Sequence, residues 1–259
     1  WRRDSSSGNQ GLCFECGYGE QSHFHSYFRG VIGLMNFHIL TLFPDMVRDG
    51  LHTSILGRAA ENGHISMNVV NIRDYTLDKN KKVDDYPYGG GAGMVLMCEP
   101  IFRAIESIRT DESIVIMLSP SGKVFKQSMA VDFSREKHLI LLCGHYEGFD
   151  ERIKTIVDME LSIGDYVLTG GEVPSMVITD AVTRLLPGVI TSESLDSESF
   201  NDGLLDYPNY TRPEEFRGMR VPEVLLSGHH KNIEKYRQEE KIRLTNENRR
   251  DLTGGEDNG

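Results

Sequence analysis

The sequence has no apolar run of the roughly 18 residues that a membrane-spanning helix needs, which argues against a transmembrane protein. Its start has no positively charged segment followed by a long apolar stretch, so no secretory signal is expected. The four cysteines, at positions 13, 16, 98 and 143, form no dense framework of the kind that small secreted domains use. Cys98 and Cys143 lie in apolar contexts, which predicts reduced core residues of a cytoplasmic protein.

Two nucleotide-binding fingerprints are also missing. No G-x-G-x-x-G opens a helix after a strand, and no G-x-x-x-x-G-K-[ST] occurs. The sequence therefore supports neither a dinucleotide-binding fold nor a P-loop.

Positive charge is scarce overall. The formal net charge is −11, whereas contacts to RNA phosphates need Lys and Arg. The segment from Arg217 to Arg250 is nonetheless locally basic: Arg217, Arg220, Lys231, Lys235, Arg237, Lys241, Arg243, Arg249 and Arg250 stand against Glu223, Glu234, Glu239, Glu240 and Glu247. This segment could bind RNA, or it could be a helix with a mixed solvated face, because Glu and Lys at helical spacing also support each other.

The length and the apolar pattern indicate an α/β protein. A chain of 259 residues with 39% hydrophobic residues can bury a full core. The pattern predicts strands over Phe37–Leu42, Ile65–Ile72, Ser113–Leu118 and His138–Cys143, and helices over Asp45–Asn62, Glu99–Arg109 and Met176–Leu186. Such alternation predicts a parallel sheet covered by helices. Thr191–Asp202 has the composition of a linker, and a helical unit is expected after it.

Residues 1–34 are rich in Ser, Gly and Gln, which predicts a disordered extension. Within them, Cys13 and Cys16 together with His23 and His25 could be drawn as a tetrahedral zinc site. The H-x-H spacing is unusual for zinc, and the segment has little to fold around a metal, so disorder is the preferred interpretation.

Two glycine-bearing turns each follow an apolar run. A strand over His138–Cys143 would bring Gly144 to the end of a buried sheet, where backbone without a side chain can lie against a ligand. The second turn, Ser162–Glu172, offers backbone donors and acceptors, with Tyr166 and Leu168 as an apolar wall for a flat ring. Glycine-rich turns often only punctuate a topology, so the spacing alone leaves a nucleoside site and a structural turn both open.

Several motifs follow one another in a fixed order. They are M-N-F-H-I-L-T-L-F-P at 35–44, V-D-D-Y-P-Y-G-G-G-A-G-M at 83–94, L-S-P-S-G at 118–122, the two turns above, L-L-D-Y-P-N-Y-T-R-P at 204–213 and V-P-E-V-L-L-S-G-H at 221–229. Together they resemble the bacterial tRNA (guanine-37-N1)-methyltransferase family. The resemblance runs from about Met35 to about Leu252, so it covers most of the chain.

This resemblance implies a fold of the SPOUT class, an α/β domain with a parallel sheet and a C-terminal trefoil knot, followed by a small helical domain. Knots are rare exceptions to ordinary chain topology. The expected parts are an extension over 1–34, a methyltransferase domain over 35–190, a linker over 191–203 and a helical tRNA-binding domain over 204–259. The resemblance also implies a homodimer whose active site takes groups from both subunits.

In this family the knot loops bind S-adenosylmethionine, and the corresponding loops here are Leu118–Gly122, Cys143–Gly148 and Ser162–Pro174. Main-chain hydrogen bonds to the adenine and apolar contact with its faces are expected. The cofactor-binding candidates carried over by position are Pro120, Gly122, Gly144, Tyr146, Gly148, Ile163, Gly164, Asp165, Tyr166, Val167, Leu168, Gly170 and Gly171.

Methylation of guanine at N1 needs a base for the N1 proton and a cation or hydrogen-bond donor near the guanine oxygen. The resemblance assigns the cation to Arg184, which without it would be read as a solvated helix residue. The family's aspartate, two residues before a phenylalanine, corresponds to Glu198. Because a glutamate carries its carboxylate one methylene further, Glu198 is preferred as the base and Asp196 stays an alternative.

The turn after the strand departs from the family pattern at His145, where the family often has arginine. This substitution removes one fixed positive charge near the site. Glu147 in the same turn is retained and could help to hold the guanine, or a magnesium ion, which prefers oxygen ligands. Alternatively it is a surface acid, and no set of residues is assigned as a metal site.

Three functions follow from these observations. The first is methyl transfer from S-adenosylmethionine to guanine 37 of tRNA, next to the anticodon, with the base turned out of its stack. The second is a SPOUT-type methyltransferase acting on another RNA site, and the third is a non-catalytic RNA-binding or structural module. The Y-T-R-P string at 210–213 and the basic C-terminal segment favour the first, whereas the departures at His145 and Glu198 give the third some weight.

Overall fold

The computed structural model describes residues 33–191, 198–200 and 202–254. The alternative zinc site and the alternative base Asp196 lie outside these residues, as does all but the end of the predicted extension.

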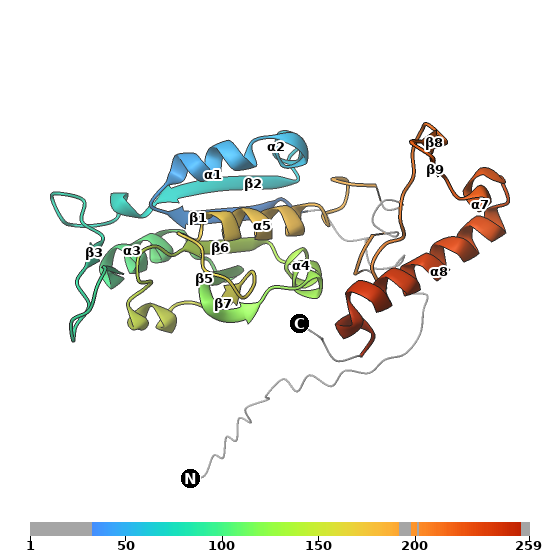
Figure 1. Ribbon diagram of the computed structural model, residues 1–259. Coiled ribbons are helices and arrows are strands. Elements are labelled where there is room, and N and C mark those ends of the chain that lie inside the picture. Colours follow the sequence, from blue (N-terminus) through green and yellow to red (C-terminus); the bar gives the residue numbers. More distant parts are fainter. Residues whose placement is uncertain (1–32, 192–197, 201, 255–259) are drawn as a thin grey trace, which may run out of the picture. The chain divides into compact units, whose positions relative to one another are not determined.

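A sheet of five parallel strands forms the centre of the α/β fold (Figure 1). The strands pair in the order β2-β1-β6-β5-β7. Their bounds are β1 Met35–Thr41, β2 Ile65–Asn71, β5 Ser113–Val124, β6 His138–Cys143 and β7 Met159–Ser162. The predicted α/β class with a parallel sheet is therefore confirmed.

Strand β6 shows why the sequence predicts buried strands so clearly. All of its residues are buried. Leu139 and Leu141 face one half of the core, and Ile140 and Leu142 face the other. Since both faces of the sheet are covered, the strand is a continuous apolar run from Leu139 to Cys143, without polar alternation.

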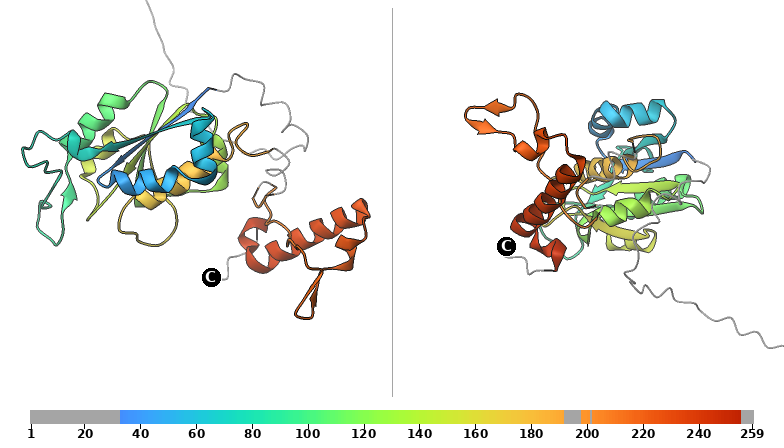
Figure 2. Two further views of the ribbon diagram at one scale, coloured as in Figure 1. Left: turned by 90° about the horizontal axis from the view of Figure 1, so that it is seen from above. Right: turned by 90° about the vertical axis from the view of Figure 1, so that its right-hand side faces the viewer.

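The two faces of the sheet carry different helices. One face is covered by α1 (Pro44–Leu51), α2 (Ser54–Glu61), α4 (Gln127–Phe133) and α5 (Glu172–Thr183). The other is covered by α3 (Cys98–Ile108) and the 3-10 turns η2 (Ile72–Asp74) and η3 (Glu151–Thr155). Figure 2 shows α1 and α5 on one side of the sheet and α3 on the other.

Short elements make up the rest of the described chain. The hairpin of β3 (Asp84–Asp85) and β4 (Val95–Leu96) encloses the glycine-rich segment 89–93, and the C-terminal region contains β8 (Glu215–Phe216), β9 (Met219–Arg220), α7 (Glu223–Leu226), α8 (His230–Asn248) and the 3-10 turn η4 (Arg250–Thr253). Among the described residues, no helix has the length and apolar character that crossing a membrane requires.

Three predicted elements need correction. The helix expected over Asp45–Asn62 is two helices, α1 and α2, and Ser54 at the start of α2 has a left-handed φ of 56°. The strand expected to end at Leu118 continues to Val124, past an irregular stretch. The helix expected over Met176–Leu186 is α5, which begins earlier, at Glu172, and ends earlier, at Thr183. The early start is possible because Pro174 falls in the first helical turn, where its missing N–H removes no intrahelical hydrogen bond.

Candidate functional site

The first loop of the site is an excursion within β5. Leu118 and Lys123 both pair with Leu161 of β7, so residues 119–122 loop out of the strand. The loop returns to the sheet at Gly122, where a Cβ atom would lie 2.5 Å from the backbone nitrogen of Leu161. Glycine is therefore required for this close approach of β5 to β7.

The second loop is the tight turn that follows β6. Tyr146 adopts a left-handed φ of 59°, and Gly148 has a φ of 103°. The backbone N–H of Gly148 donates to the carbonyl of His145 over 3.0 Å. A Cβ atom on Gly144 would lie 2.7 Å from the ring of Phe149, so this aromatic ring packs directly on the turn.

The third loop leads from β7 to α5 and returns to the second loop. The backbone N–H of Gly171 donates to the carbonyl of Gly144 over 2.9 Å, and His145 forms an isolated bridge with Gly170. A Cβ atom on Gly171 would lie 2.6 Å from the Cα atom of Cys143. The two glycine-bearing turns of the sequence thus meet through their backbones.

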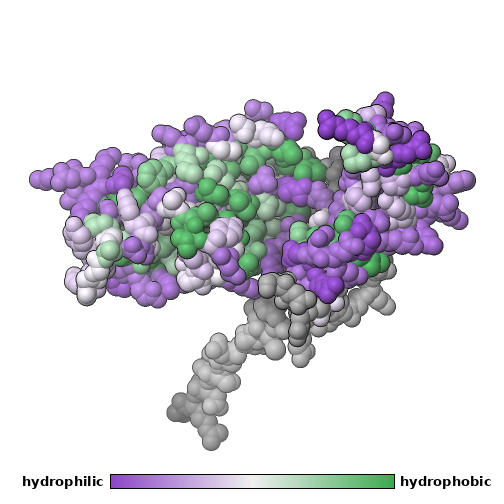
Figure 3. Space-filling view, viewed as in Figure 1, coloured by the Kyte–Doolittle hydropathy of each residue, from purple (hydrophilic) through white to green (hydrophobic). Residues whose placement is uncertain are grey.

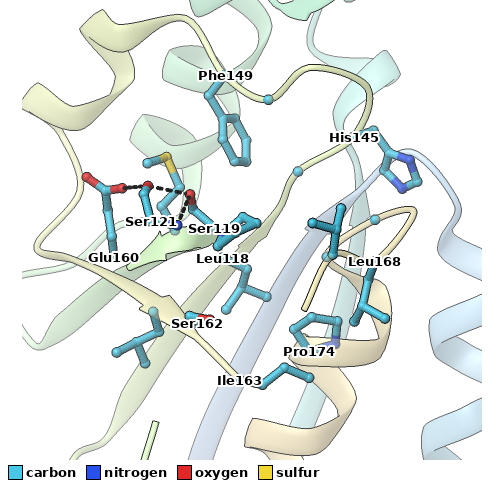
Figure 4. Close-up of a pocket in the computed structure, with 18 of the residues that line it drawn as sticks. Leu118, Ser119, Ser121, His145, Phe149, Glu160, Ser162, Ile163, Leu168 and Pro174 are labelled. Atoms are coloured by element: carbon cyan, nitrogen blue, oxygen red, sulfur yellow. Dashed lines mark hydrogen bonds between the residues drawn. The ribbon is translucent and has the colours of Figure 1, made fainter. Parts of the chain in front are cut away.

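These three loops enclose a cavity of about 360 Å³ at the carboxyl ends of β5, β6 and β7 (Figure 4). Leu118, Ile163, Leu168 and Pro174 form an apolar side. The opposite side is polar: the hydroxyls of Ser119 and Ser121 are 2.8 Å apart, and Ser121 donates to Oε2 of Glu160 over 3.2 Å. Such a volume and such a mixture of walls are typical of small-molecule sites.

Most of the predicted cofactor residues line this cavity. They are Pro120, Gly144, Tyr146, Gly148, Ile163, Gly164, Tyr166, Val167, Leu168, Gly170 and Gly171, and Glu147 lines it too. Gly122 and Asp165 do not line it, and Gly122 serves the packing of β5 on β7 instead.

The cavity also contains polar residues that the sequence did not single out. Ser119 and Ser121 lie inside the quoted L-S-P-S-G motif, so the motif itself could have suggested them. Glu160 offered no such signal, because its place at the cavity depends on β7, a short strand that the apolar pattern did not predict.

Glu147, which lines the cavity, also lies against the glycine-rich segment. Its backbone N–H donates to the carbonyl of Met94 over 3.0 Å. Gly93 has a φ of 86°, and a Cβ atom there would lie 2.5 Å from the Cγ atom of Glu147. The glycine at this position therefore allows the Glu147 side chain to pack against the backbone of the β3–β4 hairpin.

The two predicted catalytic residues Arg184 and Glu198 contact each other. Nη1 and Nη2 of Arg184 each donate to one oxygen of the Glu198 carboxylate, and both distances are 2.5 Å. The bond to Glu198 raises the pKa of Arg184 above its ordinary value, so the guanidinium stays charged. Both side chains are half-buried, and neither lines the cavity.

Many basic residues of the C-terminal segment are in local ion pairs. On α8, Lys235 pairs with Glu239, and Arg243 pairs with both Glu240 and Glu247. Lys241 is buried and pairs with Asp202 over 2.6 Å. These contacts agree with the alternative of a mixed solvated helix face, and they reduce the charge that this helix offers to RNA.

The fold and the cavity define an α/β protein with a small-molecule-sized cavity at the carboxyl edge of a parallel sheet. The family model "tRNA (Guanine-1)-methyltransferase TrmD" matches residues 35–255. The chain therefore belongs to this tRNA (guanine-1)-methyltransferase family, as the motifs predicted.

Individual relatives agree with the family model. A protein of Ureaplasma urealyticum serovar 10, named tRNA (guanine-N(1)-)-methyltransferase, is 58% identical over 219 residues, which cover 84% of this chain and 96% of that protein. Proteins of the same name from Ruminiclostridium cellulolyticum and Halalkalibacterium halodurans are 55% and 56% identical, covering 84% and 85% of this chain and 96% and 92% of their own lengths.

Proposed function

We propose that the protein transfers a methyl group from S-adenosylmethionine to N1 of guanine 37 in tRNA, next to the anticodon. The observation that carries this proposal is the cavity formed by three glycine-bearing loops in a chain of the tRNA (guanine-1)-methyltransferase family. The relatives' names, which specify tRNA and guanine N1, support the choice of substrate. A tRNA substrate would place the protein in the cytoplasm.

The cavity suits S-adenosylmethionine in size and in chemistry. The apolar side with Ile163 and Leu168 would hold the adenine ring, and the glycines of the loops would let its edge approach the main chain. The polar side with Ser121 and Glu160 would hold the ribose hydroxyls. When bound, the cofactor would supply an electrophilic methyl group, whose bond to the sulfonium sulfur breaks as the bond to N1 forms, and would leave as S-adenosylhomocysteine.

Arg184 and Glu198 are the proposed catalytic residues. The carboxylate of Glu198 would take the proton from guanine N1 as the nitrogen attacks the methyl carbon. The guanidinium of Arg184 would stabilise the negative charge that develops on the guanine oxygen. Because the two groups already lie side by side, a guanine edge could meet both at once.

Glu147 is proposed to hold the guanine or a magnesium ion. Among the described residues, no three His, Cys, Asp or Glu side chains gather closely enough to hold a metal ion. A magnesium ion beside Glu147 would therefore take its other ligands from water and substrate, as this ion commonly does.

The family's knot is a further part of the proposal. The chain leaves β7 at the edge of the sheet and reaches Gly144 beyond β6, so it crosses the end of β5. There residues 119–122 loop out of β5. We propose that the segment 163–171 is threaded through this loop, that the methyltransferase domain spans 35–190, and that a linker over 191–203 leads to a tRNA-binding domain over 204–259.

A homodimer is proposed from an apolar surface on α1 and α5. Phe43, Met46, Val173 and Val177 are large hydrophobic side chains that are 40 to 50% exposed. Figure 3 shows hydrophobic residues gathered on the face that carries these helices. Contiguous apolar surface of this kind marks interaction sites, and a second copy of the chain would cover it.

Transfer of labelled methyl from S-adenosylmethionine to a tRNA transcript with guanine at position 37 tests the function, beside the same transcript with adenine there. We expect transfer to the first transcript alone. Equal transfer to both would favour the alternative of another RNA site. Transfer to neither, with cofactor binding still measurable, would favour a non-catalytic module.

A further inference from the structure

A buried carboxylate lies directly behind the cofactor cavity. Glu172, the first residue of α5, is only 2% exposed. Its Oε2 atom lies 2.7 Å from Nε2 of His145, and its Oε1 atom accepts a hydrogen bond from the hydroxyl of Thr41. The same hydroxyl accepts from the backbone N–H of Phe43 over 2.8 Å.

These bonds connect three separate parts of the chain. Thr41 ends β1, His145 belongs to the turn after β6, and Glu172 ends the loop that follows β7. A buried carboxylate is costly unless it is paired and hydrogen-bonded. Among the described residues, His145 is the one basic side chain in contact with the Glu172 carboxylate. The position of each loop is thereby coupled to the carboxylate.

The carboxylate of Glu172 is closely packed against Gly170 and the His145 ring. A Cβ atom on Gly170 would collide with the His145 ring and would lie 2.5 Å from Oε2 of Glu172. The negative charge of Glu172 also adds to burial in raising the pKa of the Cys143 thiol at the end of β6. The carboxylate therefore sits in a closely packed junction below the two turns.

We propose that Glu172 is a positioning residue that sets the affinity for S-adenosylmethionine by clamping the turn at Gly144–Gly148 to the turn at Gly170–Gly171 through His145. This inference rests on the proposed function. Glu172 does not itself line the cavity, whereas both turns and His145 do. Loss of the clamp would leave the turns to be ordered by the cofactor, at the cost of binding free energy. The groups proposed for the chemistry, Arg184 and Glu198, lie outside this junction.

The experiment is calorimetric titration of the full chain with S-adenosylmethionine, together with KM and kcat for methyl transfer to tRNA. Glu172→Ala should weaken cofactor binding about tenfold or more and raise the cofactor KM equally, with kcat within about twofold at saturating cofactor. Glu172→Gln should restore most of the affinity, because the amide oxygen can still accept from Nε2 of His145. The control Glu112→Gln, which removes an exposed ion pair with Lys137, should change neither quantity.

A double-mutant cycle separates the clamp from a general loss of packing. If His145 transmits the effect, His145→Ala and the double variant should bind the cofactor about as weakly as Glu172→Ala. Additive losses, unchanged affinity in Glu172→Ala, or a fall in kcat without a change in KM would each overturn the proposal. Should Glu172→Ala fail to fold, His145→Ala and Thr41→Val, which each remove one partner of Glu172, supply the comparison, and affinity unchanged in both would overturn the proposal.

Amide hydrogen exchange distinguishes failure of this inference from failure of the proposed function. A wild-type chain that binds no S-adenosylmethionine would refute the proposed function, and with it the role in affinity. The clamp would then be judged from exchange at residues 144–148 and 170–171. Faster exchange there in Glu172→Ala than in Glu112→Gln, or in Thr41→Val if Glu172→Ala does not fold, would support a clamp for another ligand, and equal exchange would remove the clamp as well.

Discussion

Arg184 and Glu198 form two parallel hydrogen bonds, so the guanidinium and the carboxylate lie in the fork-to-fork arrangement that is typical of strong Arg–carboxylate pairs. Arg184 caps the C-terminal end of α5, and Glu198 lies within the proposed linker over 191–203. The pair joins the end of the sheet domain to the next part of the chain. Guanine carries a hydrogen-bond donor, N1–H, beside an acceptor, O6. This edge therefore complements the acceptor Glu198 and the donor Arg184.

Glu198→Gln should abolish the proton transfer, because an amide cannot accept the N1 proton. General-base catalysis contributes about 10²- to 10⁴-fold, and the single-turnover rate of methyl transfer should fall by that order. S-adenosylmethionine binding should stay unchanged, since Glu198 does not line the cavity. Asp196→Asn is the matched comparison, and full activity in Glu198→Gln with a loss in Asp196→Asn would move the base to Asp196.

Arg184→Lys tests the cation. A lysine keeps the charge but cannot form two parallel bonds. The transfer rate should fall about 10²- to 10³-fold, as expected when a donor to a developing oxyanion is lost. Arg135→Lys, which changes an exposed arginine paired with Asp132, is the control. If both variants keep the wild-type rate, Arg184 has no part in the mechanism.

The fold was largely predictable because the central strands bury both faces. The observed bounds of β6 are those predicted, and α3 was predicted to within one residue at each end. Strand β7 was not predicted, since Met159–Ser162 is too short to show a period. Its pairing with β5 depends on long-range packing.

The candidate site was predictable where backbone geometry demands glycine. Gly144 and Gly171 can be read from the turns, and both line the cavity. The sequence does not show that His145 pairs with Glu172, because residues so far apart meet only after the sheet forms. It likewise does not show that Arg184 and Glu198 bond to each other.

Gly171→Ala should disturb both the stability and the cofactor site. The added methyl group would lie 2.6 Å from the Cα atom of Cys143, and this neighbour is backbone that cannot rotate away. The free energy of unfolding should fall by about 1–3 kcal/mol, as for other overpacked positions. Urea unfolding measures this change, with Gly33→Ala as the control, since no atom lies within 4 Å of a Cβ at Gly33. Equal stability of the two variants would show that the junction of the turns can relax.

The stability should depend on pH through a histidine pair at the other end of the sheet. Nδ1 of His38 lies 2.7 Å from Nε2 of His138, whose Nδ1 atom contacts the Ser113 hydroxyl. Burial lowers the pKa of both imidazoles from 6.5, and the neighbouring His138 lowers that of His38 further. As the pH falls below the ordinary histidine pKa of 6.5, the unfolded chain binds more protons than the folded chain. The stability of the folded state is therefore lost as the pH falls.

Urea unfolding at about pH 7.5 and about pH 5.5 measures this loss. His38→Asn should make the stability less dependent on pH, because it removes one titrating group and the neighbouring charge. His230→Asn, at an exposed position, should leave the dependence unchanged. A pH dependence that is the same in all three proteins would assign the acid sensitivity to other groups.

Val177→Glu should convert the proposed dimer to monomer, because a carboxylate would be buried without a partner in the apolar surface on α5. Light scattering at micromolar concentration measures the mass, and Leu77→Glu is the control at an exposed hydrophobic position away from α5. A wild-type chain that is monomeric would refute the dimer.

If the active site takes groups from both subunits, Val177→Glu should also lose methyl transfer. Mixed dimers of Glu198→Gln with a subunit that cannot bind the cofactor should then regain activity that neither parent has, because one of their two sites keeps both functions. Mixed dimers as inactive as the parents would place each complete site within one subunit.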